Sequence, residues 1–338
     1  MGENHDVLKA SDQPLSSAYD VAILDLDGVV YVGHDAVTRA PEALAAAKAV
    51  GMHLAFVTNN AARPPSDVGN HLREIGIDAA DADVVTSAQA AARLLVGTIP
   101  EGSRVYVIGG EGLSQALRER GFQPVTEPGD EPVAVAQGYG PQMPWRQVVN
   151  GAMIVKSGLP WVVSNTDMTI PTAQGVGPGN GTLVRLVAEF AGREPEVAGK
   201  PQPPLFEETL ERVGGSHPLV VGDRLDTDIE GATNVGWDSL LVLTGVTGLA
   251  ELVCAEPRLR PTYIGSDLCA LATPHEVPTR QDDGFTLGGW TVSVRDGSLV
   301  VAGDGPVDDW WRAVALAAWA HLDDTGAPVD LGAVRPPR

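Results

Sequence analysis

Apolar and polar positions along the chain form two alternating patterns that predict an α/β protein. Short runs rich in valine, isoleucine and leucine are followed by longer stretches in which apolar residues recur at helical spacing. That order is typical of parallel strands joined by crossover helices. The first unit has strands at 21–24 and 53–57, and the helix at 41–50 between them begins at Pro41 and stops at Gly51.

The middle of the chain has an α/β series of its own, which indicates a separate domain. This series ends at 175–181, where glycine and proline predict a turn or hinge. Its predicted elements are strands at 105–108, 133–136 and 161–164 and helices at 113–120 and 147–156. The elements predicted after it are a helix from 182 and strands at 219–221, 240–243 and 262–264.

The tail from about residue 274 has a different pattern. Strands at 290–294 and 299–302 flank Asp296-Gly297, a strong hairpin signal, and a helix is predicted over 310–322. We therefore expect a small ββα-like extension. The tryptophans that we expect to be buried against the preceding domain, rather than to form a docking face, are Trp310, Trp311 and Trp319.

The composition and charge of the chain exclude some classes of binding partner. The chain has 338 residues, a length typical of about two domains, and its net charge is −21. Such a charge repels phosphate backbones and anionic lipid, so we expect no nucleic-acid partner and no membrane insertion. The N-terminal residues lack a signal-peptide pattern, and two cysteines, Cys254 and Cys269, are too few for a disulfide framework. These features predict a cytoplasmic protein whose cysteines are buried thiols.

Carboxylates follow two of the predicted strands. Asp25 and Asp27 close the first strand, and Asp223, Asp226 and Asp228 follow a later one. Open α/β sheets bind ligands at the carboxyl ends of their strands. Carboxylates this close repel one another unless they share a cation, and Mg²⁺ prefers oxygen ligands. Taken alone, the first pair could equally be a helix cap and a turn residue.

Two other segments carry groups that suit a phosphate. Thr58, Asn59 and Asn60 follow a predicted strand and offer hydroxyl and amide groups. Lys200 stands within a Gly-Lys-Pro sequence, where a fixed ammonium could bind a phosphoryl group. Each also has an ordinary interpretation, a helix cap for the first segment and a solvated surface lysine for the second.

Taken in order, these segments resemble the four motifs of the haloacid dehalogenase superfamily. The resemblance is to its type IIA branch, which includes p-nitrophenyl phosphatases, nucleotide monophosphatases, pyridoxal phosphatase and glycerol-3-phosphate phosphatases, and it spans about residues 18–273. The segments that carry it are 27–33, Thr58-Asn59-Asn60, 164–167, 178–181, Gly199-Lys200-Pro201 and 222–229.

The resemblance implies a Rossmann-like core with an inserted α/β cap, followed here by a small α+β extension. The expected bounds are 18–85 and 181–273 for the core, 86–180 for the cap and 274–338 for the extension. Actinobacterial glycerol-3-phosphate phosphatases carry a similar extension that resembles part of an acetyltransferase fold. The extension has no acetyl-CoA phosphate-binding loop, so we expect no acetyl transfer.

The resemblance also implies a magnesium-dependent phosphatase. Asp25 would be the nucleophile that forms an aspartyl-phosphate, and Asp27 would act as general acid and then as general base. Mg²⁺ would be bound by Asp25, by the backbone carbonyl of Asp27 and by Asp223. Asp228 would support the direct ligands through hydrogen bonds.

The phosphate-binding residues implied by the resemblance are polar or cationic. Thr58 and Lys200 would take part in catalysis and, with Asn59 and Asn60, would bind the non-bridging oxygens. Asn165 and Asp167 are candidate substrate contacts from the cap.

The expected substrate is a small phosphate monoester, with glycerol 3-phosphate preferred and glycerophospholipid recycling as the expected role. The extension and the alanine-rich composition favour that choice. Sugar phosphates, phosphoglycolate, pyridoxal phosphate and nucleotide monophosphates are the alternatives, as is phosphoryl transfer to a sugar. The cap segments 138–140 and 145–146 depart from the pattern of the branch, so the leaving group stays open.

Three other interpretations of the sequence are possible. A nucleotide-dependent oxidoreductase would need a third glycine where Gln115 stands after Gly110 and Gly112, so we interpret that segment as a tight turn. The extension could have a binding or regulatory role without catalysis. A homo-oligomer that pairs through the cap is the open alternative to a monomer.

Overall fold

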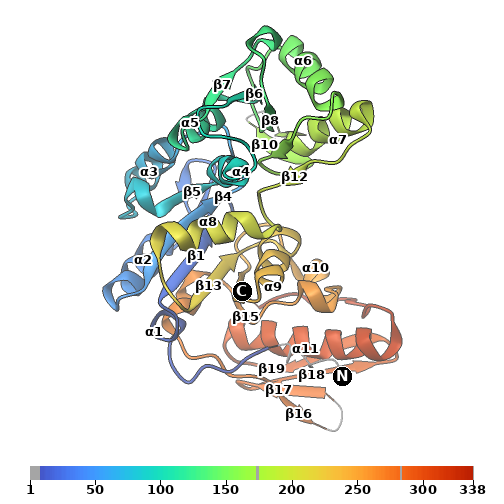
Figure 1. Ribbon diagram of the computed structural model, residues 1–338. Coiled ribbons are helices and arrows are strands. Elements are labelled where there is room, and N and C mark those ends of the chain that lie inside the picture. Colours follow the sequence, from blue (N-terminus) through green and yellow to red (C-terminus); the bar gives the residue numbers. More distant parts are fainter. Residues whose placement is uncertain (1–7, 173–174, 282–283, 338) are drawn as a thin grey trace. The chain divides into compact units, whose positions relative to one another are not determined.

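The chain divides into two units, each with its own parallel strands (Figure 1). Unit 1 contains the residues up to 54, residues 75–78 and those from 215 onward, and unit 2 contains residues 55–74 and 79–214. This computed structural model describes residues 8–172, 175–281 and 284–337. The α/β class expected from the sequence is confirmed, and the expected bounds of core, cap and extension stay a prediction.

The sheet of unit 1 brings two acidic strand ends together. Its parallel strands follow the order β15–β14–β13–β1, and Leu24 of β1 is in register with Val221 of β13. The residues after this pair, Asp25 and Asp223, therefore reach the same edge of the sheet. The strands are β1 (Val21–Asp25), β13 (Pro218–Gly222), β14 (Asp238–Val242) and β15 (Tyr263–Gly265).

These strands are buried over nearly their whole length, as parallel strands covered on both faces must be. Their sequences are therefore unbroken apolar runs. The strand bounds predicted from the sequence agree with the structure to within two residues. The helices of this part are α1 (Leu15–Ala18), α2 (Ala40–Ala49), α9 (Glu230–Val235) and α10 (Leu249–Val253), and a small hairpin joins β2 (Tyr31–Val32) to β3 (Asp35–Ala36).

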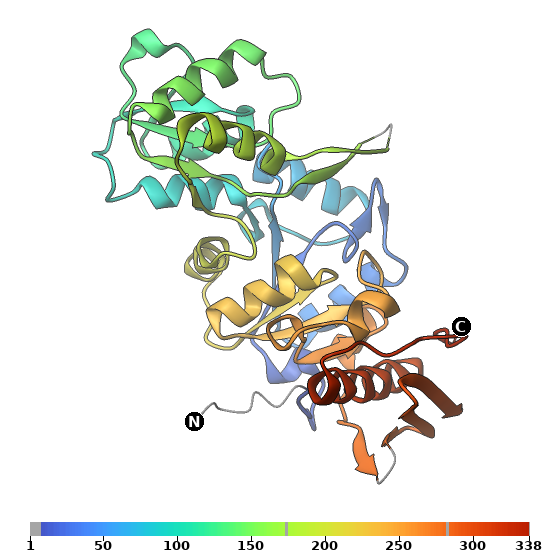
Figure 2. The same ribbon diagram turned by 90° about the vertical axis from the view of Figure 1, so that its right-hand side faces the viewer.

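The extension has two more strands than the sequence pattern predicts. β16 (Thr279–Gln281), β17 (Gly284–Leu287), β18 (Trp290–Arg295) and β19 (Ser298–Gly303) form an antiparallel sheet, which α11 (Val307–Thr325) covers (Figure 2). The predicted hairpin is present, with Asp296 and Gly297 both at positive φ, as a two-residue turn requires. β16 is exposed throughout, so it has no apolar alternation to detect.

The tryptophans of α11 are core residues, which confirms the interpretation preferred over a docking face. Trp310, Trp311 and Trp319 are at most 6% exposed and belong to one apolar cluster with residues of α10 and β15. The Trp319 indole Nε1 donates to the Leu252 carbonyl at 2.8 Å. Arg260 stacks on the same indole and binds both carboxylate oxygens of Asp323 at 2.7 and 2.6 Å.

The expectation that both cysteines are buried is wrong. Cys254 is exposed and Cys269 is partly exposed. Cys254 ends α10, and Cys269 stands in the first turn of a short helix capped by Asp267, so both lie at element ends where the chain meets solvent.

His275 joins the N-terminal segment to the start of the extension. Its backbone exchanges two hydrogen bonds with Ser11, and its Nε2 lies 2.9 Å from the Ala270 carbonyl oxygen. The ring is 1% exposed and makes an edge contact with Tyr263. Burial, together with the positive charge of Arg312, lowers the pKa of His275 to about 4.

The neutral form of this histidine should make unfolding pH-dependent. The unfolded chain takes up the proton below about pH 6.5 and the folded chain only below about 4, so stability falls as pH drops through that window. We expect wild type to lose about 2 kcal/mol more than His275→Gln between pH 7 and pH 5. Urea unfolding of both proteins at the two pH values measures this difference, and equal losses would contradict the assignment.

Unit 2 contains a five-stranded parallel sheet with helices on both faces. Its strand order is β12–β9–β8–β6–β7. Helices α6 (Trp145–Lys156) and α7 (Asn180–Ala191) pack together on one face, and their apolar residues form a cluster with β6, β8 and β9. The strands are β6 (Arg104–Ile108), β7 (Gln123–Val125), β8 (Ala134–Gln137), β9 (Trp161–Val163) and β12 (Glu196–Val197).

Most predicted elements of unit 2 are present, with one difference. The stretch expected to be only a turn contains β11 (Gly175–Pro178), which pairs antiparallel with β10 (Thr169–Thr172). β4 (His53–Thr58) belongs to unit 2 from Ala55 onward, and it pairs with β5 (Val84–Thr86). The helices are α3 (Pro65–Glu74), α4 (Ser87–Leu95), α5 (Glu111–Glu119), α6 (Trp145–Lys156), α7 (Asn180–Ala191) and α8 (Pro203–Val213).

Candidate active site

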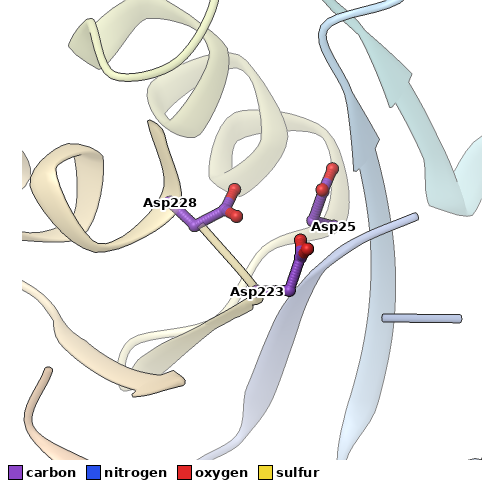
Figure 3. Close-up of side chains that lie close together, drawn as sticks. All are labelled: Asp25, Asp223 and Asp228. Carbon is purple, nitrogen blue, oxygen red and sulfur yellow. The ribbon is translucent and has the colours of Figure 1, made fainter. Parts of the chain in front are cut away.

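Three carboxylates converge at the carboxyl edge of the unit 1 sheet (Figure 3). Asp25 is the last residue of β1, Asp223 follows β13, and Asp228 lies one helical turn further on. One oxygen from each lies within 4.8 Å of the others. Asp223 and Asp228 are fully buried and Asp25 is partly exposed, so the cluster opens to solvent on the side of Asp25.

Backbone donors and glycines hold Asp223 in place. The Val246 N–H donates to Asp223 Oδ2 at 2.6 Å. A Cβ on Gly28 would lie 2.6 Å from the same oxygen, and one on Gly245 would lie closer still. Gly28 also has a φ of +85°, which other residues rarely adopt. Two glycines from distant segments thus make room for one buried carboxylate.

Asp228 is oriented by the turn that carries it. This turn is a short π-helix over Leu225–Ile229, and the Arg224 N–H donates to Asp228 Oδ2 at 3.1 Å. Gly222 leaves room for the Asp228 side chain, because a Cβ there would collide with it. The intervening acid, Asp226, points to solvent and is paired with Arg224, so it is not part of the cluster.

Asp27 lies two residues beyond Asp25 and is exposed. The chain turns sharply there, because the Gly28 N–H donates to the Tyr31 carbonyl at 2.8 Å. The Gly28 carbonyl in turn accepts from the Thr244 hydroxyl at 2.6 Å. An exposed carboxyl two residues from Asp25 can meet a substrate from solvent, as a proton-transfer group must.

The cluster suits a hard divalent cation. Carboxylate oxygens are the ligands that Mg²⁺ prefers, and a cation removes the repulsion among three carboxylates. Sequence reasoning named Asp25 and Asp223 as ligands and Asp228 as a supporting group, and the structure brings all three together. The individual roles stay predictions.

A second polar cluster lies in unit 2 and is organised by Asn59. Its Oδ1 accepts from the Lys200 N–H at 2.9 Å, and its Nδ2 donates to the Lys200 carbonyl at 3.1 Å and to both oxygens of Asp167 at 3.2 Å. Asn165 donates to the Asn59 carbonyl at 2.6 Å. Four residues predicted separately from the sequence are thus joined in one network.

Lys200 and Thr58 are buried in this part of the chain, 3% and 5% exposed. A buried ammonium requires anionic groups around it, so Lys200 is well placed to bind an anion. The Thr58 hydroxyl accepts from the Asn60 N–H at 3.0 Å, and Asn60 accepts from the Ala62 N–H at 2.9 Å. The loop after β4 is therefore fixed by its own side chains.

Sequence reasoning assigned no role to the residues that support this network. The Ser87 hydroxyl donates to the Asn59 carbonyl at 2.6 Å, and Asn180 donates to the Asn165 carbonyl at 2.7 Å. Gly199 is required because a Cβ there would lie 2.6 Å from Asn59 Oδ1. Ser87 and Asn180 stand at helix starts, so their sequence signal is that of a cap.

Glycines after β6 and after β8 stand where backbone segments approach closely. A Cβ on Gly112 would lie 2.6 Å from the Ala61 carbonyl oxygen, and one on Gly140 would lie 2.7 Å from the Gly109 carbonyl carbon.

Comparison with known proteins places the chain among phosphatases. Residues 22–123 match the haloacid dehalogenase-like hydrolase family, and residues 197–271 match the HAD-hydrolase-like family. The D-glycerol 3-phosphate phosphatase of Mycobacterium tuberculosis is 40% identical over 90% of this chain and 87% of its own length. An acid sugar phosphatase of Staphylococcus aureus is 35% identical over 74% of this chain and 95% of its own.

A solved structure agrees with these matches. The glycerol phosphate phosphatase of Mycobacterium tuberculosis in complex with magnesium superposes with a TM-score of 0.84 at 39% identity, over 95% of this chain and 94% of that one. The second family match ends at residue 271, so neither match includes α11 or its sheet. No helix among the described residues is long and apolar enough to cross a membrane.

Proposed function

Because the chain belongs to the haloacid dehalogenase-like hydrolases and is a phosphoric monoester hydrolase, we propose that it hydrolyses glycerol 3-phosphate to glycerol and phosphate. The observation that carries the reaction type is the convergence of Asp25 with two buried carboxylates. The choice of substrate is supported by the mycobacterial D-glycerol 3-phosphate phosphatase, which matches over nearly the whole chain.

Asp25 is the proposed nucleophile. It ends a buried strand and is the partly exposed member of the cluster, so one of its oxygens can reach a phosphorus atom from solvent. Attack by that oxygen forms an aspartyl-phosphate and releases the glycerol oxygen. Water then attacks the phosphorus, returns the carboxylate and releases phosphate. Two steps with lower barriers replace one difficult displacement.

Asp27 is the proposed proton carrier. In the first step its carboxyl gives a proton to the departing glycerol oxygen, and in the second it takes a proton from the attacking water. Its exposure and its position two residues from Asp25 suit a group that must reach both atoms.

Mg²⁺ is the cofactor of the reaction. Asp25, the Asp27 carbonyl and Asp223 are its proposed ligands, and Asp228 supports them. When bound, the ion neutralises phosphoryl charge and reduces repulsion between the substrate and the carboxylate cluster.

The Asn59 network is the proposed phosphate-binding part. Lys200 supplies a fixed positive charge, and Thr58, Asn59 and Asn60 supply polar groups for the non-bridging oxygens. Asn165 and Asp167, from the expected cap, hold Asn59 in position, and Asn59 in turn binds the backbone of Lys200. A protein with a net charge of −21 can in this way offer a locally cationic site to an anion.

We expect a substrate panel to separate glycerol 3-phosphate from the alternatives. Phosphate release is measured from glycerol 3-phosphate, a hexose phosphate, phosphoglycolate, pyridoxal phosphate and a nucleoside monophosphate. The expected result is the highest kcat/KM for glycerol 3-phosphate, by roughly tenfold or more. Equal values across the panel would instead support a broad-specificity phosphatase. A preference for glycerol 3-phosphate would fit a role in recycling glycerophospholipid head groups.

A further inference from the structure

Gly28, the residue after Asp27, has to be a glycine, and its backbone is therefore intrinsically flexible. A Cβ at this position would lie 2.6 Å from Asp223 Oδ2, and the φ of Gly28 is +85°. Glycine has a wider range of backbone conformations than any other residue. No side chain restricts the backbone next to the proposed proton carrier, so its conformation depends on the contacts that Gly28 makes.

Two hydrogen bonds hold Gly28, one at each of its backbone polar groups. Its N–H donates to the Tyr31 carbonyl at 2.8 Å, within the same turn. Its carbonyl accepts from the Thr244 hydroxyl at 2.6 Å, which joins residues 216 positions apart in the chain. That distance is at the short end of the range for a hydroxyl donor, as in a well-formed hydrogen bond. The second bond joins the turn after β1 to the loop after β14.

The loop that carries Thr244 is itself fixed against the carboxylate cluster. The Val246 N–H donates to Asp223 Oδ2 at 2.6 Å, and the Thr247 N–H donates to the Asp223 backbone carbonyl at 3.1 Å. These donors belong to unit 1, as do the turn after β1 and all three carboxylates of the cluster. The Thr244 hydroxyl thus links the turn after β1 to a loop whose position is set by a buried carboxylate.

We propose that Thr244 is a positioning residue for proton transfer by Asp27. Its hydroxyl fixes the Gly28 carbonyl, and the conformation of Gly28 sets the direction in which the Asp27 side chain leaves the turn. A general acid acts only within hydrogen-bond reach of the oxygen that it protonates, so a small displacement of its carboxyl lowers the rate. The inference rests on the proposed function, and it adds a residue that acts through Asp27 without touching a reacting atom.

The leaving group of the substrate distinguishes proton transfer from the other parts of the reaction. When the P–O bond of glycerol 3-phosphate breaks, the departing alkoxide oxygen is strongly basic and takes the proton of Asp27. When the same bond of p-nitrophenyl phosphate breaks, p-nitrophenolate departs as a stable anion and needs no proton. The value of kcat/KM covers the reaction up to this departure, so the later attack of water does not enter it.

The main variant is Thr244→Val, which keeps the shape of the side chain and removes the hydroxyl. We expect it to lower kcat/KM for glycerol 3-phosphate by roughly 10- to 100-fold and to leave kcat/KM for p-nitrophenyl phosphate within about threefold. Thr244→Ala should give the same selectivity, and Thr244→Ser should restore both values because it restores the hydroxyl. The ratio of the two kcat/KM values does not depend on how much of a variant folds.

Thr325→Val is the matched control. The Thr325 hydroxyl also donates to a backbone carbonyl, that of His321 at 2.7 Å, but it lies in the last turn of α11. Both kcat/KM values should stay within about twofold of wild type in this variant, as for surface changes generally.

The variant Asp27→Asn shows whether Thr244 acts through Asp27. Alone, it should lower kcat/KM for glycerol 3-phosphate by roughly 100-fold or more, with the same selectivity. Adding Thr244→Val should cause no further loss beyond about threefold, because the effects of coupled residues are not additive. Fully additive losses would overturn the proposal. Equal losses on the two substrates in Thr244→Val would overturn it as well, since they would show a hydroxyl that only stabilises the loop beside Asp223.

Failure of the proposed function gives a different result. If wild type prefers another alkyl phosphate, that ester takes the place of glycerol 3-phosphate, and the same selectivity in Thr244→Val supports the positioning role. Equal losses on both substrates in Asp27→Asn would show that Asp27 is not the proton carrier, and would contradict both proposals. A selective loss in Asp27→Asn without one in Thr244→Val would contradict the role of Thr244 alone.

Discussion

Asp25→Asn is expected to abolish turnover. An amide oxygen is a poor nucleophile toward phosphorus, and the other carboxylates of the cluster, Asp223 and Asp228, are fully buried and cannot replace it. We expect kcat to fall by roughly 10⁴-fold or more, the scale seen when a nucleophile is removed from other hydrolases. Phosphate release from glycerol 3-phosphate by freshly purified protein measures the loss.

The matched control for this substitution is Asp226→Asn. Asp226 lies in the same acidic loop as Asp228, but it points to solvent and is paired with Arg224. The substitution changes the charge of the protein by the same amount, and activity should stay within about twofold, as for surface changes generally. Wild-type activity in Asp25→Asn, with the fold confirmed by circular dichroism, would falsify the assignment of the nucleophile.

Removal of divalent cations is expected to have the second largest effect. Without a cation the carboxylate cluster repels the phosphoryl oxygens, so exhaustive treatment with EDTA should lower kcat by roughly 10³-fold or more. Activity should return when Mg²⁺ is added. Asp223→Asn should raise the Mg²⁺ concentration needed for half-maximal activity, because one charged ligand is lost while the amide keeps the shape.

Two observations would contradict the metal assignment. The first is full activity after EDTA treatment with metal content verified by elemental analysis. The second is an unchanged Mg²⁺ requirement in Asp223→Asn. Asp238→Asn is a suitable comparison, because Asp238 is a partly buried acid at the opposite end of a neighbouring strand, where it binds Lys9 and Tyr19.

Local patterns predicted the parallel strands well because these strands are buried on both faces. The runs at 21–24 and 219–221 contain only apolar residues, and the structure extends them by one or two residues. The strands β10 and β11 were missed because they form a hairpin whose residues are largely proline, glycine and threonine, and because β11 is largely exposed. Pairing with each other, rather than burial, makes them strands.

The sequence could likewise predict only part of the candidate site, because some of its contacts join residues far apart in the chain. Asp25, Asp223 and Asp228 could be found because each follows an apolar run, and strand ends meet at one edge of a sheet. The bonds from Asn59 to Asp167 and Lys200 join residues separated by 108 and 141 positions, and no local spacing predicts them.

The apolar cluster that contains the tryptophans of α11 also determines whether the extension can be separated from the rest of the enzyme. Trp310 and Trp319 of α11 belong to the same apolar cluster as Leu252 of α10 and Ile264 of β15. A chain cut near residue 273 would expose that face to water, although the cut lies between recognisable segments. The extension cannot be exchanged or removed as a module in the way an appended domain can. Its contribution must be studied by single substitutions on its solvent-facing side.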